Sequence, residues 1–265
     1  MEPIKVLVHG ASGRMGREVM VALCREPALE PVAAVEKHVV EEYLSLPDGS
    51  GLIPFSSDVE QSIVRSRPDV IVDFSEAGAA VNAARMAFKH GVRFVSGTTG
   101  ISDREIEELQ KLATANSVGG VVAPNFALGA VLMIHLAKTV SRFFDYAEIL
   151  EMHHEQKLDA PSGTALTTAR EMIEARGRPF AGAAAQKETL PNTRGGQMDG
   201  IAIHAIRLPG LLAHQEVIFG GAGQTLTIRH DTISRESFIP GLILAVKEVM
   251  KLNRLVMGLD TLLGL

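Results

Sequence analysis

Cysteine is almost absent from this sequence, which has one such residue, Cys24, among 265. A single thiol cannot close a disulfide within the chain, and it cannot build a zinc site from several cysteines. So little cysteine also fits a reducing compartment. Strand-like residues begin at Ile4, without the charged leader and apolar core of a signal peptide. We therefore expect a cytoplasmic protein.

Long apolar runs and an excess of positive charge are missing as well. A membrane span needs ~18 or more apolar residues in succession, whereas the apolar run 126–137 is shorter and is followed by Lys138. The net charge is −5 and the isoelectric point is near 6.0, which argues against nucleic acid as the main partner. We therefore expect neither a membrane nor a nucleic acid as partner. The 265 residues, 46% of them hydrophobic, provide for one large or two modest globular domains.

Residues 1–37 follow the order of a dinucleotide-binding βαβ unit. The apolar runs 5–9 and 31–35 predict two strands, and apolar residues at helical spacing predict a helix between them. Three glycines at a spacing of three precede that helix: Gly10, Gly13 and Gly16. Glycines in this context predict a turn that holds a pyrophosphate. Gly10 permits the tight turn, Gly13 lets the backbone approach the phosphates, and Gly16 allows close helix packing.

The residues after the second strand bear on the choice of coenzyme. Glu36 lies 20 positions beyond Gly16, where an acid accepts hydrogen bonds from the ribose hydroxyls of NAD. Lys37 is a cation that could pair with the 2′-phosphate of NADP. A solvated lysine without a ligand explains Lys37 equally well. Both NADH and NADPH therefore stay open.

Strands alternate with helices until about residue 125, which predicts a Rossmann-type, doubly wound parallel sheet. The expected elements are strands at 69–74, 92–95 and 120–123, helices at 58–67, 79–90 and 102–115, and a mobile polar excursion at 38–50. Ser102 and Glu105 form a capping-box pattern at the start of the third helix. Residues 97–99 and 123–126 stand at strand ends, where such sheets bind ligands.

The pattern changes after Asn125. A helix over 127–144 leads to a strand from 146, and the glycine- and alanine-rich segment 180–200 is interpreted as a loop. Three alternating segments, at 201–207, 213–219 and 224–230, predict antiparallel strands with one covered face. A last helix is expected at 237–252.

The fold class is therefore α/β, with a Rossmann-type sheet and a second α+β domain that has a mixed or antiparallel sheet. We expect residues 1–126 to form the dinucleotide-binding domain, with a C-terminal helix at 238–265 packing back on it. Residues 127–237 are expected to form the domain for substrate binding and oligomerisation.

Titratable residues gather between a strand and a helix in the segment 148–165, which reads E-I-L-E-M-H-H-E-Q-K-L-D-A-P-S-G-T-A. Alternation along a strand places Glu151 and His153 on one side. Ser162, Gly163 and Thr164 open the next helix, whose free N–H groups can hold an anion, so we expect them to bind substrate. Metal-assisted hydrolysis through Glu151, His153 and Glu155 is a further interpretation. Nothing supplies a clear ligand set for it, and we expect no metal.

These segments resemble the dihydrodipicolinate reductase family. The segment 148–165 is similar to the family's signature, and the segments 10–16, 97–100 and 125–126 match the family in the same order. The resemblance covers essentially the whole chain. It implies an NAD(P)H-dependent reduction of 4-hydroxy-tetrahydrodipicolinate to tetrahydrodipicolinate, with loss of water, in lysine and diaminopimelate biosynthesis.

The resemblance also implies roles for individual residues. His153 is then the acid/base, Lys157 is a second proton donor, and His154, Gly163 and Thr164 bind a small dicarboxylate substrate. Residues that match coenzyme contacts of the family are Gly10, Ala11, Ser12, Gly13, Arg14, Met15, Glu36, Lys37, Gly97, Thr98, Thr99, Ala123, Pro124, Asn125, Phe126, Arg235 and Phe238. Pro124 departs from the family pattern and removes one backbone N–H from its loop. A homotetramer assembled through the sheet of the second domain is implied as well.

Two other functions compete with this one. Another Rossmann-fold dehydrogenase, acting on a small amino or hydroxy acid, would carry the same glycine turn. A dinucleotide-sensing regulator would use its second domain to bind a protein or DNA. The acidic net charge of −5 and the dense group of His153, His154 and Lys157 argue against the regulator.

Overall fold

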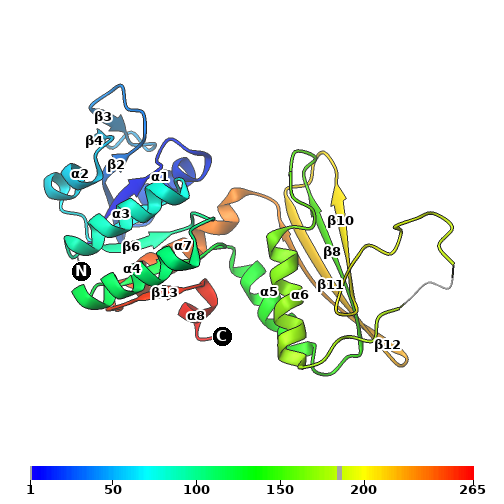
Figure 1. Cartoon of the computed structure of the whole chain (residues 1–265). Coiled ribbons are helices and arrows are strands. Elements are labelled where there is room, and N and C mark those ends of the chain that lie inside the picture. Colours follow the sequence, from blue (N-terminus) through cyan, green and yellow to red (C-terminus); the bar gives the residue numbers. More distant parts are fainter. Residues whose placement is uncertain (1, 184–186) are drawn as a thin grey trace. The chain divides into compact units, whose positions relative to one another are not determined.

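The computed structural model describes residues 2–183 and 187–265 (Figure 1). The chain divides into two compact units. Unit 1 consists of Met1–Leu128 and Phe238–Leu265, and unit 2 consists of Gly129–Ser237. In the described part of the chain, no helix has the length and apolar character that a membrane span requires.

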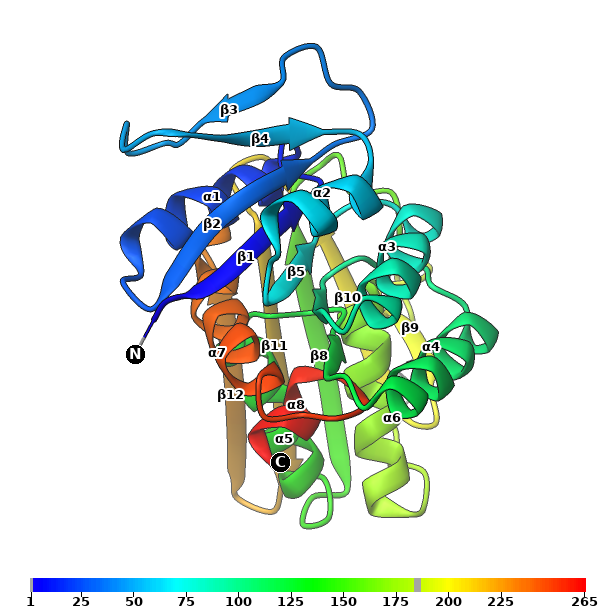
Figure 2. The same cartoon turned by 90° about the vertical axis from the view of Figure 1, so that its left-hand side faces the viewer.

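Unit 1 is built on an eight-stranded sheet with the order β13-β7-β6-β5-β1-β2-β4-β3, and Figure 2 labels its strands β1 to β5. Its strands are β1 (Ile4–His9), β2 (Leu29–Val35), β3 (Tyr43–Ser45), β4 (Leu52–Ser56), β5 (Val70–Asp73), β6 (Arg93–Ser96), β7 (Gly120–Val122) and β13 (Leu255–Met257). Every neighbouring pair is parallel except the hairpin of β3 and β4. All four residues of β5 are buried, as expected for a strand with helices over both faces.

The helices of unit 1 cover both faces of this sheet (Figure 2). They are α1 (Arg14–Arg25), α2 (Val59–Ser66), α3 (Ala77–Lys89), α4 (Asp103–Asn116), α7 (Ile239–Val249) and α8 (Leu259–Leu263). Helices α2, α3 and α4 share one core, in which Phe88 and Leu109 pack against strand residues such as Phe94. Ser102 and Glu105 make the predicted capping box at the start of α4.

Unit 2 has a five-stranded sheet with the order β12-β11-β8-β10-β9. Its elements are β8 (Tyr146–His153), β9 (Gly196–Met198), β10 (Ile201–Arg207), β11 (Ala213–Gly221), β12 (Gln224–Thr232), α5 (Leu128–Val140) and α6 (Gly163–Arg176). Helices α5 and α6 lie against one face of the sheet (Figure 1) and bury Ile149, Val217 and Phe219 there. The α/β fold class, with a Rossmann-type sheet and a second mixed sheet, is confirmed.

Four expectations about single segments are wrong. Segment 38–50 contains β3, segment 180–200 contains β9, and segment 238–265 is α7 followed by the edge strand β13 and by α8, not one helix. These three strands have three residues each, too few to show an alternating pattern. In addition, the segment 201–207 was expected to be an antiparallel strand, but as β10 it runs parallel to β8 and antiparallel only to the short strand β9, because β8 lies between β10 and β11.

Strand β8 also extends further than the expected strand and ends at His153. Its alternation places Glu151 and His153 on the face that α5 and α6 cover, while Glu148 lies on the other face. The first titratable residues of the segment 148–165 therefore belong to a regular strand, and the hydrogen bonds to its neighbouring strands fix the direction of their side chains.

Candidate active site

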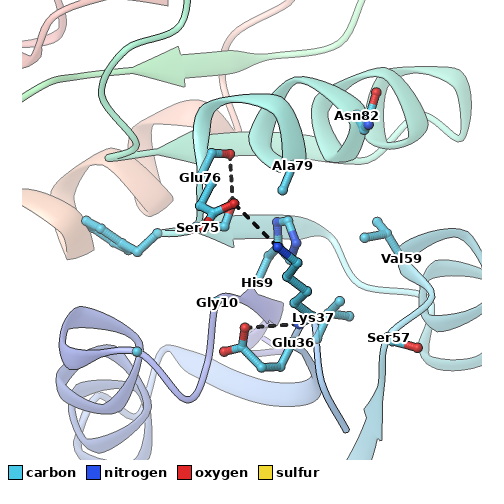
Figure 3. A pocket seen from close by; sticks show the side chains of 13 residues that line it. His9, Gly10, Glu36, Lys37, Ser57, Val59, Ser75, Glu76, Ala79 and Asn82 are labelled. Atoms are coloured by element: carbon cyan, nitrogen blue, oxygen red, sulfur yellow. Dashed lines mark hydrogen bonds and ion pairs between the residues drawn. The ribbon is translucent and has the colours of Figure 1, made fainter.

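The strand order of unit 1 reverses between β1 and β5. From β1 the chain proceeds outward to β2 and β4, and it then returns to β5 on the other side of β1. Doubly wound sheets bind ligands at the carboxyl ends of strands at such a reversal. A pocket of about 620 Å³ is lined by Gly10 and Gly13 after β1, Glu36 and Lys37 after β2, and Phe74 after β5 (Figure 3).

The glycine turn offers close packing and free donors, as a pyrophosphate site requires. Gly10 has φ of +80°, and a Cβ added there would lie 2.5 Å from the carbonyl oxygen of Phe74. A Cβ added at Gly16 would lie 2.1 Å from the carbonyl oxygen of Gly10. Helix α1 is capped by Gly13 without a side-chain hydrogen bond, so its first N–H groups are available to an anion. These residues fit a dinucleotide.

The carboxylate of Glu36 holds the glycine turn to the end of β2. Its Oε2 accepts from the Ser12 N–H at 3.0 Å, and its Oε1 accepts from the Lys37 N–H at 3.0 Å. Each oxygen keeps a lone pair for a ribose hydroxyl. The Lys37 Nζ lies 3.9 Å from Glu76 Oε2, with the two side chains 71% and 82% exposed, so this ion pair is weak. Lys37 is therefore able to meet a 2′-phosphate.

A buried acid joins the ends of three strands of unit 1. Asp73, at the end of β5, is fully buried and accepts hydrogen bonds from Ser75, Ser96 and Thr98 at 2.5, 2.6 and 2.7 Å. The His9 Nδ1 lies 2.8 Å from its Oδ1. Burial alone would raise the pKa of Asp73, but His9, Ser75 and Ser96 together hold that pKa below its ordinary value. The Thr98 hydroxyl is thus engaged with the protein itself.

Phe74 connects the pocket with two loops that were expected to contact the coenzyme. A Cβ added at Gly97 would lie 2.2 Å from the Phe74 ring, and the ring centroids of Phe74 and Phe126 are 6.0 Å apart. The loops after β6 and β7 therefore meet beside the glycine turn. Asn125 caps its own loop, because its Oδ1 accepts from the Ala127 N–H at 2.9 Å.

The expected coenzyme residues do not all line the pocket. Those that line it are Gly10, Gly13, Glu36 and Lys37. Those outside the lining are Ala11 and Ser12 of the same turn, Arg14 and Met15 of α1, Gly97, Thr98 and Thr99 after β6, and Ala123, Pro124, Asn125 and Phe126 after β7. Arg235 and Phe238 are the ends of a short 3₁₀ helix (Arg235–Phe238), and they belong to unit 2 and unit 1 respectively.

In unit 2, the carboxylate of Glu151 is fully buried and accepts four hydrogen bonds. The His153 Nδ1 lies 2.6 Å from Oε2. Arg207, at the end of β10, donates from Nη1 to Oε2 at 2.9 Å and from Nη2 to Oε1 at 2.7 Å. The Ser162 N–H donates to Oε1 at 3.0 Å. The predicted pairing of Glu151 and His153 on one side of the strand is confirmed.

These contacts set the ionisation of Glu151. Burial alone would raise its pKa, but the hydrogen bonds from His153 and Arg207 lower the pKa to about 2. The carboxylate is therefore charged at neutral pH. Because an ionised carboxylate only accepts hydrogen bonds, the Nδ1 of His153 carries the proton in this contact.

The loop from His154 to Asp159 folds back toward Arg207. The Lys157 Nζ lies 2.7 Å from Asp159 Oδ1, and the Arg207 Nη2 donates to the Asp159 carbonyl oxygen at 2.7 Å. The hydrogen bond from Lys157 is the main cause that lowers the pKa of Asp159. Lys157 is partly buried, with 22% of its side chain exposed.

Helix α6 starts beside this loop and presents an anion-receptive end. Ser162 is its N-cap, and the Ser162 Oγ accepts from the Ala165 N–H at 3.2 Å. Ser162 is buried, so its N–H and its hydroxyl serve the fold. Gly163 is exposed and Thr164 is half-exposed, and the N–H groups of a first helical turn have no partner within the helix.

Sequence reasoning missed Asp73 and Arg207, and it assigned Glu151 only to a metal site. Asp73 and Glu151 each carry a charge at a position where the covered face of the strand is otherwise apolar. A charge at such a position needs a partner, which is the signal that could have found them. In the described part of the chain, no group of three or more His, Cys, Asp or Glu side chains has the arrangement of a metal site.

Comparisons with known proteins cover both units. Family models described as "Dihydrodipicolinate reductase, N-terminus" and "Dihydrodipicolinate reductase, C-terminus" match residues 4–126 and 129–263. A 4-hydroxy-tetrahydrodipicolinate reductase of Dehalococcoides mccartyi is 54% identical over 265 residues, which are 100% of each chain. A protein with the same description from Moorella thermoacetica is 49% identical over 263 residues, which are 98% of each chain.

The solved structures agree. A dipicolinate-bound dihydrodipicolinate reductase from a Paenisporosarcina species aligns with a TM-score of 0.89 and 40% identity, over 98% of this chain and 99% of that one. An amine dehydrogenase from Mycobacterium smegmatis, at 15% identity and a TM-score of 0.61 over 93% of this chain and 92% of that one, shares the fold alone.

The low pKa of Glu151 predicts a pH window for its contribution to stability. A carboxyl whose pKa falls from 4.5 to about 2 on folding stabilises the folded state above pH ~4.5, and this contribution is lost as the pH falls toward ~2. We expect Glu151→Gln to lower the melting temperature at pH 7, and the gap to wild type to shrink between pH ~4.5 and ~2. Thermal melts of both proteins from pH 7 to 2 measure this gap. A constant gap would contradict the assignment.

Proposed function

Because this chain belongs to the dihydrodipicolinate reductase family, we propose that unit 1 holds the coenzyme and unit 2 holds the substrate of its reaction. That reaction is the NAD(P)H-dependent reduction of 4-hydroxy-tetrahydrodipicolinate to tetrahydrodipicolinate in lysine and diaminopimelate biosynthesis. The full-length similarity to reductases of this description carries the assignment. It does not favour the other dehydrogenases or the dinucleotide-sensing regulator.

The pocket of unit 1 supports the proposal that the coenzyme binds there. The uncapped start of α1 offers N–H groups to the pyrophosphate, and Glu36 offers lone pairs to the ribose hydroxyls. Lys37 supports the binding of NADPH, because the ion pair that it makes with Glu76 is long and exposed. When bound, the reduced nicotinamide supplies a hydride.

The substrate is a small dicarboxylate, and the related reductase from Paenisporosarcina holds dipicolinate. We assign its carboxylates to cations and to free N–H groups of unit 2. The start of α6 at Gly163 and Thr164 offers the N–H groups. Lys157 offers an ammonium group when its ion pair with Asp159 is replaced by one with the substrate. His154 offers a further hydrogen-bond donor when it is protonated.

His153 is the residue that we assign to proton donation. Hydride addition to the substrate ring leaves electron density that needs a proton, and histidine titrates near neutral pH. The Nδ1 of His153 is engaged by Glu151, which leaves Nε2 as the nitrogen that can give a proton to substrate. Lys157, two positions from Asp159 in the same loop, is the second candidate donor.

We further propose that the protein is a cytoplasmic homotetramer that assembles through the sheet of unit 2. Helices α5 and α6 lie on one face of this sheet (Figure 1). The other face carries half-exposed apolar side chains, among them Leu150, Ile206 and Ile218. We expect a tetramer of about four times 28.4 kDa by sedimentation equilibrium. A monomer at micromolar concentration would contradict the proposal.

The reductase activity is tested by coenzyme oxidation. We expect the purified protein to oxidise NADH and NADPH when the preceding pathway enzyme supplies freshly made substrate, because both coenzymes fit Glu36 and Lys37. Absorbance at the nicotinamide band measures the rate. Samples without substrate serve as the control, and absence of oxidation with both coenzymes would rule the function out.

The proton-donor role predicts a separation of kinetic constants. We expect His153→Gln to lower kcat by about 10²-fold or more while KM changes far less, because proton donation acts in the transition state. Steady-state kinetics with saturating coenzyme measure both constants. An unchanged kcat would remove His153 from the mechanism.

A further inference from the structure

We infer that Glu151 is the positioning residue for proton transfer: its carboxylate holds the His153 ring in the one tautomer and orientation that present Nε2 to the substrate. The inference rests on the proposed role of His153. Glu151 itself has no solvent-exposed surface, so it acts through the imidazole and not on the substrate directly.

The geometry around Glu151 leaves its carboxylate a single orientation. Arg207 binds both oxygens, and the Ser162 N–H binds Oε1 from a third direction. The His153 contact at 2.6 Å therefore meets an oxygen that cannot turn away. A neutral imidazole has one N–H, and the hydrogen bond made by that nitrogen decides which nitrogen remains free. Here that choice leaves Nε2 free.

The same carboxylate also ties the proton donor to the anion-receptive end of α6. Its Oε2 accepts the hydrogen bond from His153 of β8, and its Oε1 accepts the hydrogen bond from the N–H of the N-cap residue Ser162. Arg207 connects the end of β10 to this carboxylate. A further hydrogen bond of Arg207, to the Asp159 carbonyl oxygen, connects the loop that carries Lys157 as well. Loss of this carboxylate therefore releases both the direction of the imidazole and the placement of the groups that we assign to the substrate.

The charges near His153 come from several elements. Glu151 lies on its own strand, Arg207 comes from β10, and Lys157 with Asp159 belongs to the following loop. Strand β11 places uncharged Ala213 opposite His153, and the first turn of α6 has no acid. Of these charged groups, Glu151 is the one whose hydrogen bond to the His153 ring sets the direction of Nδ1.

The chain contains a matched control on the same strand. Glu148, three residues before Glu151 on β8, also binds one arginine and one histidine, namely Arg194 and His204. It lies on the opposite face of the sheet. Glu148→Gln therefore removes the same charge from a similar cluster without touching His153.

The test compares wild type, Glu151→Gln and Glu148→Gln by steady-state kinetics and by ¹⁵N NMR of the His153 ring. We expect Glu151→Gln to lower kcat at pH 7 at least ~10-fold with a smaller change in KM. The neutral His153 ring of Glu151→Gln should no longer hold its proton on Nδ1 alone, because the charged acceptor is gone. Glu148→Gln should keep the wild-type kcat and the wild-type ring tautomer.

A second variant separates positioning from stability. Glu151→Gln leaves the Arg207 guanidinium without the carboxylate that it pairs with, which is itself destabilising. The double variant Glu151→Gln with Arg207→Gln removes both charges. We expect it to melt closer to wild type while its kcat stays low and its His153 tautomer stays altered. A kcat and a tautomer that return to the wild-type state together with the melting temperature would show that Glu151 is only structural, and would overturn the inference.

The outcome also distinguishes this inference from the proposed function. If His153→Gln keeps the wild-type kcat, the proton-donor role fails, and the positioning role fails with it. If His153→Gln is slow while Glu151→Gln keeps the wild-type kcat and the wild-type His153 tautomer, the reductase mechanism stands and the positioning role of Glu151 is wrong.

Discussion

A charged carboxylate that water cannot reach determines the arrangement of unit 2 around His153. An ionised group in the interior is costly unless charge-assisted hydrogen bonds replace its hydration. Glu151 obtains those bonds from three separate parts of the chain: His153, Ser162 and Arg207. Each of these parts must lie within hydrogen-bond distance of one carboxylate, so the requirement for solvation of Glu151 also fixes the imidazole, the start of α6 and the end of β10. The same hydrogen bonds therefore stabilise the fold of unit 2 and orient the residue that we assign to proton donation.

Unit 1 uses the same construction at its own strand ends. Asp73 is buried, closes β5, and gathers the hydroxyls of Ser96 and Thr98 from the segment of β6 and its loop. A histidine, His9, approaches it as His153 approaches Glu151. In both units a buried acid holds the ends of neighbouring strands together, which suits the rigid support that the ligand sites proposed at these strand ends require.

The sequence predicted the parts of this architecture that depend on local patterns. The glycine turn, the buried strand β5 and the capping box of α4 follow from spacing within about ten residues, and their physical causes act over the same range. The pairing of Glu151 with Arg207 spans 56 residues and depends on β10 lying beside β8. The sequence does not predict that neighbourhood, because the alternation of β10, β11 and β12 indicates strands with one covered face but not the order in which the strands pair. The three-residue strands β3, β9 and β13 were missed for a related reason: their pairing partners, not their own residues, make them strands.

If Glu151 selects the tautomer of His153 as we infer, nitrogen NMR reads the result directly. Histidine labelled with ¹⁵N in the ring gives separate signals for Nδ1 and Nε2, and the signals of His153 are those that disappear in His153→Gln. At a pH where the ring is neutral, we expect a protonated Nδ1 and an unprotonated Nε2 in the wild-type protein. A ring that carries its proton on Nε2 and not on Nδ1 would contradict the positioning role of Glu151, because the Glu151 carboxylate would then accept no hydrogen bond from the ring.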